Sequence, residues 1–166
     1  MEFTDGLFVE VARKVAVGDP AIEFHDCIID NRCNHLITYP GDYEVIVLPN
    51  LYGDIVSDLC AAMIGGLGWR GGANIGTEAA VFDAPHGSSP TFAGKDRMNP
   101  TAPMLSGVYM LDHLEESTAE PAPENAIAAG IRKSDKVTYD LKPTRDDPTA
   151  VGTSEFADAV IEEMNA

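Results

Sequence analysis

Basic residues are scarce in this chain of 166 residues. Its 11 Lys and Arg stand against 27 Asp and Glu, which gives a formal net charge of −16 at pH 7. Proteins that bind nucleic acids or anionic membranes present a positive surface to the phosphates. The charge balance therefore argues against both kinds of partner. Because the acids are scattered rather than gathered in a tail, they are typical of a solvated surface, and we interpret them as adaptation to a salt-rich cytoplasm.

Long apolar runs and paired cysteines are also lacking. No run approaches the roughly 20 apolar residues that a membrane span requires, and the N-terminus lacks the basic-then-apolar pattern of a secretory signal. Three cysteines are an odd number without the spacing of metal ligands, so we expect reduced, mostly buried thiols. These absences predict a cytoplasmic protein without a membrane span, and its 45% of hydrophobic residues suffice for a core.

The stretch NLYGDIVSDL, residues 50–59, concentrates the polar residues with chemical interest. It follows the β-branched run 43–48, which predicts a buried strand. From Asp54 the spacing becomes helical, with Ile55 on the expected inner face and Asp54 and Asp58 together on another face. Hard cations such as Mg²⁺ and Mn²⁺ prefer paired carboxylates of this kind. On spacing alone, an equally good interpretation makes Asp54 a helix cap and Asp58 a solvated residue.

Apolar spacing predicts further elements along the chain. The first 17 residues predict a helix, and Ile22–Ile29 predicts a strand that ends beside Asp30. Asp30 would cap a short helix over Asn31–Tyr39. Asn99–Thr101 is a strong helix start, and a final helix is expected through Met164. The side chains expected to face the core are Phe3, Leu7, Val11 and Val15 of the first helix and Phe156, Val160 and Ile161 of the last.

Glycine and proline gather in residues 65–99, which include the start of the run HGSSPTFAGKDRMNP at His86. Glycine allows a ligand's phosphate or ribose to approach the backbone closely, and an imidazole can stack on adenine. A run rich in Gly, Ser and Pro is more often an ordinary surface loop. Two short apolar pieces, 73–75 and 79–82, interrupt the loops.

The segment NLYGDIVSDLCAAMIGGLG resembles the metal-binding segment of the β-decarboxylating dehydrogenases, the isocitrate and isopropylmalate dehydrogenase family, and isocitrate dehydrogenase in particular. The resemblance implies that Asp54 and Asp58 bind the Mg²⁺ or Mn²⁺ that chelates the hydroxy acid. It also implies that Asp30, after the strand IID, reaches across a dimer interface to the metal of the neighbouring protomer.

The run from His86 to Pro100 resembles the adenine-nucleotide loop of the same family. The resemblance implies that the adenosine site is lined by His86, Gly87, Ser88, Ser89 and Asn99. Thr91 and Phe92 hold the two positions whose residue types distinguish NAD-dependent from NADP-dependent members of the family. They match neither the residues typical of NAD-dependent members nor those typical of NADP-dependent members. VTYDL, residues 137–141, resembles the segment whose tyrosine contacts the 2′-phosphate of NADP, and Tyr139 matches that tyrosine. We therefore favour NADP, with NAD as the alternative.

The resemblance covers the whole chain but only the C-terminal half of the family's polypeptide. It implies an incomplete three-layer α/β/α fold. Residues 1–64 would form part of the small α/β domain, with the metal-binding strand and helix. Residues 65–166 would form the C-terminal part of the large nucleotide-binding domain. The implied reaction is oxidative decarboxylation of isocitrate, a 2-hydroxy tricarboxylate, to 2-oxoglutarate. The family's substrate arginines and catalytic lysine and tyrosine lie in the other half, so we expect no catalytic residue here and no activity from this chain alone.

Two kinds of function remain open. The chain is either a piece of a working isocitrate or isopropylmalate-type dehydrogenase, completed by an N-terminal polypeptide, or a catalytically silent regulatory partner. Retention of Asp30, Asp54, Asp58 and His86 favours the first. The incomplete sheet predicts unpaired strand edges, which promote association. We therefore expect a homodimer or a complex with the missing half.

Overall fold

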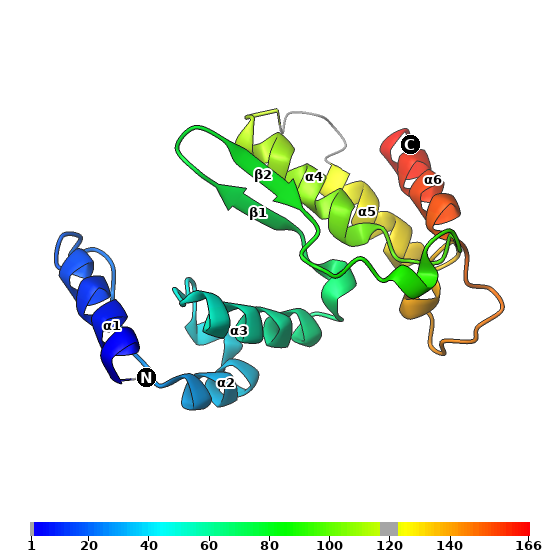
Figure 1. The fold of residues 1–166 in the computed structure, drawn as a ribbon. Helices are drawn as coiled ribbons and strands as arrows, with labels where there is room; N and C mark the ends of the chain where they lie inside the picture. Colours follow the sequence, from blue (N-terminus) through cyan, green and yellow to red (C-terminus); the bar gives the residue numbers. More distant parts are fainter. Residues whose placement is uncertain (1, 117–122) are drawn as a thin grey trace. The chain divides into compact units, whose positions relative to one another are not determined.

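Helices supply most of the regular structure in the computed structural model, which describes residues 2–116 and 123–166 (Figure 1). None of the helices in these ranges is long and apolar enough to cross a membrane. The chain divides into two compact units, unit 1 at Met1–Met63 and unit 2 at Ile64–Ala166. The division falls beside the boundary predicted from the sequence. The roles predicted for the two parts stay predictions.

The α-helices in the described residues of unit 1 are α1 (Glu2–Ala16), α2 (Ile29–Thr38) and α3 (Asn50–Met63). A short 3₁₀ turn at Pro40–Asp42 follows α2, and α2 contacts α3. Few hydrophobic side chains are buried in this unit, and among its described residues they are Leu36, Val56 and Ala61. The three cysteines are free as predicted, but the prediction that they are mostly buried is wrong, because Cys27 is exposed and the other two are half-buried.

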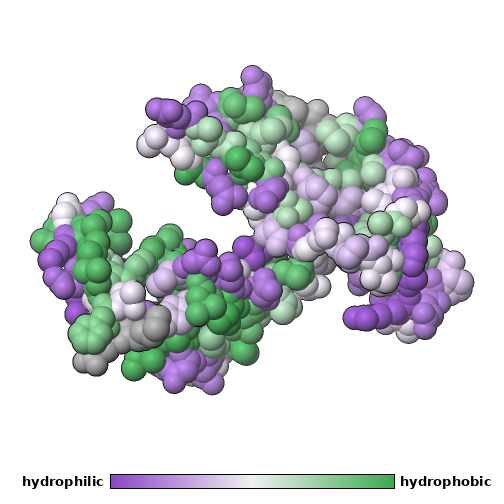
Figure 2. Space-filling model, in the orientation of Figure 1, coloured by the Kyte–Doolittle hydropathy of each residue, from purple (hydrophilic) through white to green (hydrophobic). Residues whose placement is uncertain are grey.

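The predicted helix at the N-terminus is confirmed, but the predicted burial of its apolar face is wrong. Phe3, Leu7, Val11 and Val15 are 90%, 61%, 50% and 71% exposed. They lie on one stripe of α1 because residues three and four apart share a helix face. Nothing in the described part of the chain covers this stripe. Figure 2 shows the hydrophobic surface that unit 1 presents.

Both strands predicted in unit 1 are absent from its described residues. The segments 22–28 and 43–48 form no ladder, and Val45 and Val47 are 84% and 71% exposed. β-Branched residues favour a strand because they pack well on a pleated, half-buried surface, so the preference needs a neighbouring strand to act. The described residues of unit 1 offer no such neighbour.

Unit 2 begins with a β-hairpin. Strand β1 (Gly72–Ile75) pairs antiparallel with β2 (Ala80–Asp83), at the positions of the two apolar pieces in the sequence. Helix α4 (Thr101–His113) contacts both strands. A side chain at Gly71 would meet the backbone of α4, with its Cβ 3.0 Å from the amide nitrogen of Ser106, so the hairpin and α4 approach closely there. The Ser106 hydroxyl oxygen lies 2.8 Å from the carbonyl oxygen of Asp83 and accepts the Gly72 amide at 3.1 Å.

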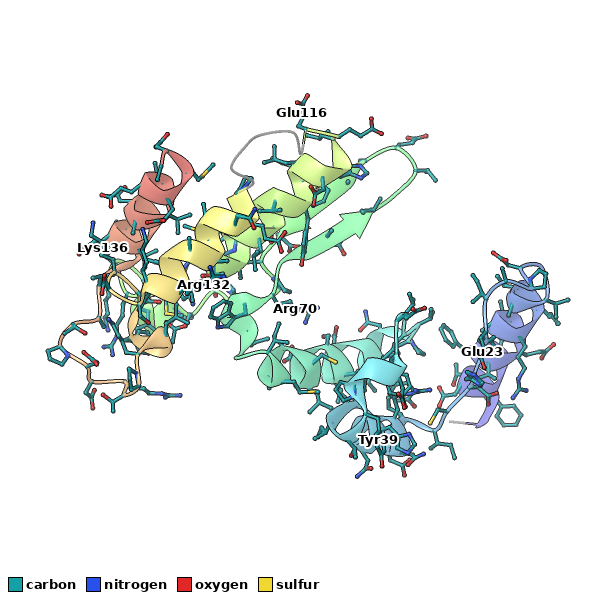
Figure 3. All side chains as sticks on the ribbon, turned by 180° about the vertical axis from the view of Figure 1, so that it is seen from behind. Glu23, Tyr39, Arg70, Glu116, Arg132 and Lys136 are labelled. Carbon is teal, nitrogen blue, oxygen red and sulfur yellow. The ribbon has the colours of Figure 1, made fainter. Side chains whose placement is uncertain are left out.

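The core of unit 2 lies among its helices. Helix α5 (Pro123–Lys133) packs against α6 (Thr153–Met164), and Lys136 pairs with Glu162 of α6 at 3.2 Å (Figure 3). Predicted burial is confirmed for Phe156 and Val160 but wrong for Ile161, which is 54% exposed because its side chain points about 100° around the helix from Val160. The buried cluster consists of Val108, Ala126, Ile127, Val137, Phe156 and Val160.

Candidate metal and nucleotide sites

The two aspartates of α3 lie together on the solvent side of the helix. Helix α3 begins at Asn50, so Asp54 falls in its second turn, and the prediction that it stands at the helix start or cap is wrong. Helical bonding already runs through Gly53, whose amide donates to the carbonyl of Pro49 at 2.8 Å. Asp54 and Asp58 are exposed, as is Ile55, whose predicted burial is wrong. The pair is open to a ligand from solvent.

Asp30 lies at the second residue of α2 and is also exposed. Its carboxylate accepts the amide of Asn31 at 2.6 Å, and the cap position belongs to Ile28, which makes no side-chain cap bond. The prediction of Asp30 as a cap is therefore wrong, although it stands in the first turn, where an anion is favoured.

The described residues of one chain do not assemble a three-carboxylate site. Within residues 2–116 and 123–166, no group of three or more His, Cys, Asp or Glu side chains is placed to hold a metal ion. The carboxylate pair Asp54 and Asp58 nevertheless fits Mg²⁺ or Mn²⁺, because these ions are usually bound through one or two carboxylates, with substrate and water oxygens completing the shell. A metal here needs ligands in addition to the pair.

The loop that follows β2 presents its first residues to solvent. His86, Gly87 and Ser88 are exposed, and the His86 Nδ1 lies 3.0 Å from the carbonyl oxygen of Gly87. Ser89 takes a left-handed backbone conformation with φ 45°, which leads into a 3₁₀ turn at Pro90–Phe92. The predicted adenosine-site residues at the start of this loop are thus accessible to a ligand.

Asn99 closes the loop and is 92% shielded from solvent, since its exposed fraction is 8%. Its Oδ1 accepts both the amide of Thr101 at 2.9 Å and the Thr101 hydroxyl at 2.6 Å. Its Nδ2 donates to the carboxylate of Asp140 at 2.8 Å. Two lone pairs and one of two N–H groups are engaged in this way. The Asn99 side chain therefore fastens the loop to the first turn of α4 and to the segment that carries Tyr139.

Arg97 brings two predicted nucleotide residues together. Its guanidinium lies 4.5 Å from the centroid of the Tyr139 ring and 5.9 Å from that of the Phe92 ring. The Lys95 ammonium lies 5.7 Å from the Phe92 ring. Cations over aromatic faces at these distances attract the ring quadrupole. Lys95 and Arg97 were not predicted from the sequence as residues of this site. The charged run KDR, inside a loop rich in Gly and Pro, could have indicated them.

An open cavity of about 380 Å³ lies beside this cluster. Around Tyr139 its lining carries balanced charge, with three cationic side chains (Lys95, Arg97 and Arg145) and three carboxylates (Asp96, Asp146 and Asp147). Hydrogen bonds from the Thr149 hydroxyl and then the Thr149 amide lower the pKa of Asp147 and keep that carboxylate ionised. The formal charge of the lining is zero, which is a poor match for a phosphate dianion.

Comparison with known proteins decides the family. The family model described as isocitrate/isopropylmalate dehydrogenase matches residues 1–160. The chain belongs to the isocitrate/isopropylmalate dehydrogenase family. This confirms the predicted family, together with the expectation that the chain corresponds to part of the family's polypeptide.

Individual members of the isocitrate/isopropylmalate dehydrogenase family are similar to this chain in structure and in sequence. A crystal structure of isocitrate dehydrogenase from Methylococcus capsulatus superposes with a TM-score of 0.91 at 42% identity, over 99% of this chain and 48% of that one. The probable alpha subunit of an NAD isocitrate dehydrogenase from Drosophila melanogaster is 43% identical over 85% of this chain and 37% of its own. A regulatory subunit of the NAD isocitrate dehydrogenase from Dictyostelium discoideum is 46% identical over 85% of this chain and 40% of its own. The predicted α/β fold of this family is confirmed, and the chain spans less than half of these relatives.

The preference for NADP is wrong. Both curated relatives carry NAD in their names, and so do further isocitrate dehydrogenases that match the chain. The preference rested on Tyr139, but a tyrosine hydroxyl carries no positive charge with which to bind the 2′-phosphate of NADP. Pro143, four residues after Tyr139, adds no positive charge, and the carboxylates that line the neighbouring cavity offset the cations there.

Proposed function

We propose that this chain supplies the metal-binding and nucleotide-binding residues of an NAD-dependent isocitrate dehydrogenase. Unit 1 acts as part of the small domain with the metal ligands, and unit 2 acts as part of the nucleotide-binding domain. The observation that carries the proposal is the exposure of both predicted groups, Asp54 with Asp58 on α3 and His86 to Ser88 in the loop, in a member of this family.

The aspartates of unit 1 are proposed to hold Mg²⁺ or Mn²⁺. Asp54 and Asp58 contribute from one chain, and Asp30 contributes from a second copy, which is consistent with the lack of a three-carboxylate cluster in the described residues of one chain. When bound, the cation supplies Lewis-acid polarisation of the substrate's hydroxyl oxygen. The chain's own part is to hold the two carboxylates of α3 exposed and one helical turn apart.

The loop of unit 2 is proposed to take the adenosine end of NAD. Gly87 and Ser88 offer exposed backbone to the ribose and phosphate oxygens, and the exposed imidazole of His86 is available to stack on adenine. Thr91 is exposed and Phe92 half-buried at the positions that separate the two cofactors. Asn99 is proposed to support this site, because its hydrogen bond to Asp140 ties the end of the loop to the segment that carries Tyr139.

The exposed apolar stripe of α1 and the outer edges of the β1–β2 hairpin that are unpaired in the described residues suggest that a further part of the fold packs on them. The stripe of Phe3, Leu7, Val11 and Val15 is exposed, and β1 and β2 pair only with each other within the described residues. We propose that the remainder of the family fold covers them, supplied by a further polypeptide or by another part of a longer chain. That remainder also provides the groups that bind the tricarboxylate and move protons.

A reconstitution assay tests the proposed function. The purified chain is assayed with isocitrate, Mn²⁺ and NAD, alone and after addition of the N-terminal half of the Methylococcus enzyme, and 3-isopropylmalate is offered in parallel. We expect NADH only from the mixture with isocitrate, and its loss in Asp54→Asn and Asp58→Asn. Asp158→Asn, at an aspartate of α6 in the other unit, is the control that keeps activity. Turnover that survives both α3 substitutions would overturn the metal assignment, and turnover by the chain alone would overturn the need for a complement.

A second candidate is favoured by one relative. The Dictyostelium protein that shares 46% identity is named as regulatory. In this alternative the chain binds nucleotide or metal but contributes to turnover only by raising the rate of a catalytic partner. It is favoured if the mixture stays inactive while the chain alone still binds NAD or Mn²⁺ in a calorimetric titration.

A further inference from the structure

Asp96 has an unusual backbone conformation for a residue with a side chain. It lies in the charged run of the nucleotide loop, with φ 48° in the left-handed region. Residues other than glycine are uncommon there, although Asp and Asn tolerate it better than most because their short polar side chains bond locally. Such a conformation persists when surrounding contacts hold it.

Contacts with the start of α6 hold Asp96 in place. Its backbone carbonyl accepts the amide of Thr153 at 3.1 Å. Its Oδ1 accepts the amide of Ser154 at 2.9 Å and the Ser154 hydroxyl at 2.8 Å. Thr153 and Ser154 are the first two residues of α6, whose own cap position, Gly152, makes no side-chain cap bond. An aspartate 58 positions earlier in the chain therefore satisfies the free N–H groups of this helix.

Gly152 makes this contact possible. A Cβ at position 152 would stand 2.4 Å from the Asp96 Oδ2 and 2.8 Å from the Asp96 carbonyl oxygen. Neither distance is compatible with a side chain, so any other residue would push the loop away from α6. A third link lies next to these, where the Thr153 hydroxyl donates to the carbonyl of Met98 at 2.5 Å.

Of the loop and helix α6, the helix is the part that the core holds in place. Phe156, in its first turn, is 0% exposed and belongs to the core cluster of unit 2. The loop from His86 to Met98, by contrast, is exposed along most of its length. The contacts therefore fasten an exposed loop to a helix that the core already holds.

We infer that Asp96 is a positioning residue for NAD binding, which it serves by tying the loop to α6 without touching the nucleotide. The inference rests on the proposed nucleotide site. A ligand binds in proportion to the fraction of molecules whose site is already in the binding conformation. Cutting the tie lowers that fraction, and the apparent dissociation constant for NAD rises by the same factor. Loss of a capping acceptor of this kind shifts such an equilibrium about fivefold, which sets the upper limit on the rise of the dissociation constant.

Three variants separate this role from a general effect on stability. Asp96→Ala removes the acceptor and disfavours the left-handed backbone, whereas Asp96→Asn keeps an acceptor oxygen and tolerates that backbone. Val160→Ala is the matched control, because it loosens α6 in the buried core while leaving the Asp96 contacts intact. NAD affinity is measured by isothermal titration calorimetry on the full chain, and hydrogen exchange reports the order of residues 86–98.

The expected result is a weaker NAD affinity in Asp96→Ala, by up to about fivefold, with faster exchange across the loop. Asp96→Asn should restore both, and Val160→Ala should lower the melting temperature while leaving both near wild type. The inference is overturned if loop exchange in Asp96→Ala equals wild type, or if Val160→Ala weakens NAD as much as Asp96→Ala does. A wild-type chain that does not bind NAD refutes the nucleotide site itself, whereas equal binding by wild type and Asp96→Ala refutes only the tie.

Discussion

The two units of the chain differ in how they use their apolar residues. Among its described residues, unit 2 buries eight hydrophobic side chains, of which Ala102, Val137 and Phe156 are completely shielded from solvent. Among the described residues of unit 1 only three are buried, while α1 alone exposes a stripe that includes Phe3 at 90%. Burial of apolar surface is the main favourable term in folding. The difference indicates that unit 2 is stabilised by its own core, whereas unit 1 buries little apolar surface among its described residues.

The difference also bears on function. The nucleotide loop of unit 2 is fastened by Asn99 and Asp96 to helices that pack in a closed core. The aspartates of unit 1 stand on helices with little buried support, and one chain does not gather three of them within its described residues. We therefore expect this chain to bind nucleotide with fewer residues from another polypeptide than it needs to bind the metal.

The largest expected effect is in the core of unit 2. Phe156→Ala removes a fully buried ring, and such substitutions cost about 3–5 kcal/mol of unfolding free energy. Phe3→Ala, the same change at a 90% exposed side chain, should stay within about 0.5 kcal/mol. Urea unfolding followed by circular dichroism measures both. Equal costs at the two positions would show that the exposed stripe is buried in solution.

A smaller loss is expected in unit 1. Leu36→Ala, at a side chain 4% exposed, should cost about 2 kcal/mol, the lower end for such substitutions, because a thinly covered site collapses more easily. Its neighbour Ile37 is 61% exposed and serves as the control, with little effect expected from Ile37→Ala. Hydrogen exchange should show the loss in residues 29–63 alone. Loosening that spreads through the core of unit 2 would contradict the independence of the two units.

The smallest effect is pH-dependent and belongs to unit 2. Hydrogen bonds from Thr149 lower the pKa of Asp147 below its ordinary value of 3.8. A lowered folded-state pKa contributes stability that is present above 3.8 and is lost as the pH falls through the folded value. Thr149→Val should therefore melt slightly below wild type at neutral pH, with the difference shrinking in acid. A difference that stays constant down to that acid range would rule out this origin.

Elements with local signals were predictable from the sequence. The start of α4 beside Asn99, the helical spacing of Phe156 and Val160, and the apolar pieces of the hairpin each show in a few neighbouring residues. The strands expected at 22–29 and 43–48 failed because a strand is stabilised by its neighbours, and composition alone does not supply them. The start of α3 was placed too late because Gly53 suggested a turn, yet a helix tolerates a single glycine at modest cost.

The candidate sites were predictable in the same uneven way. The carboxylate pair on α3 follows from a spacing of four residues, and exposure of both side chains agrees with it. The stacking of Arg97 on Tyr139 and the tie from Asp96 to Ser154 join positions far apart in the chain. A local sequence pattern does not predict such contacts, because each of the two residues taken alone is typical of a protein surface.

A titration of the isotopically labelled chain with NAD, followed by two-dimensional NMR, tests the central claim most directly, namely that unit 2 carries the nucleotide site. We expect shifts concentrated in residues 86–99 and at Tyr139, with the resonances of unit 1 unchanged. Shifts confined to unit 1, or no shifts at saturating NAD, would contradict it.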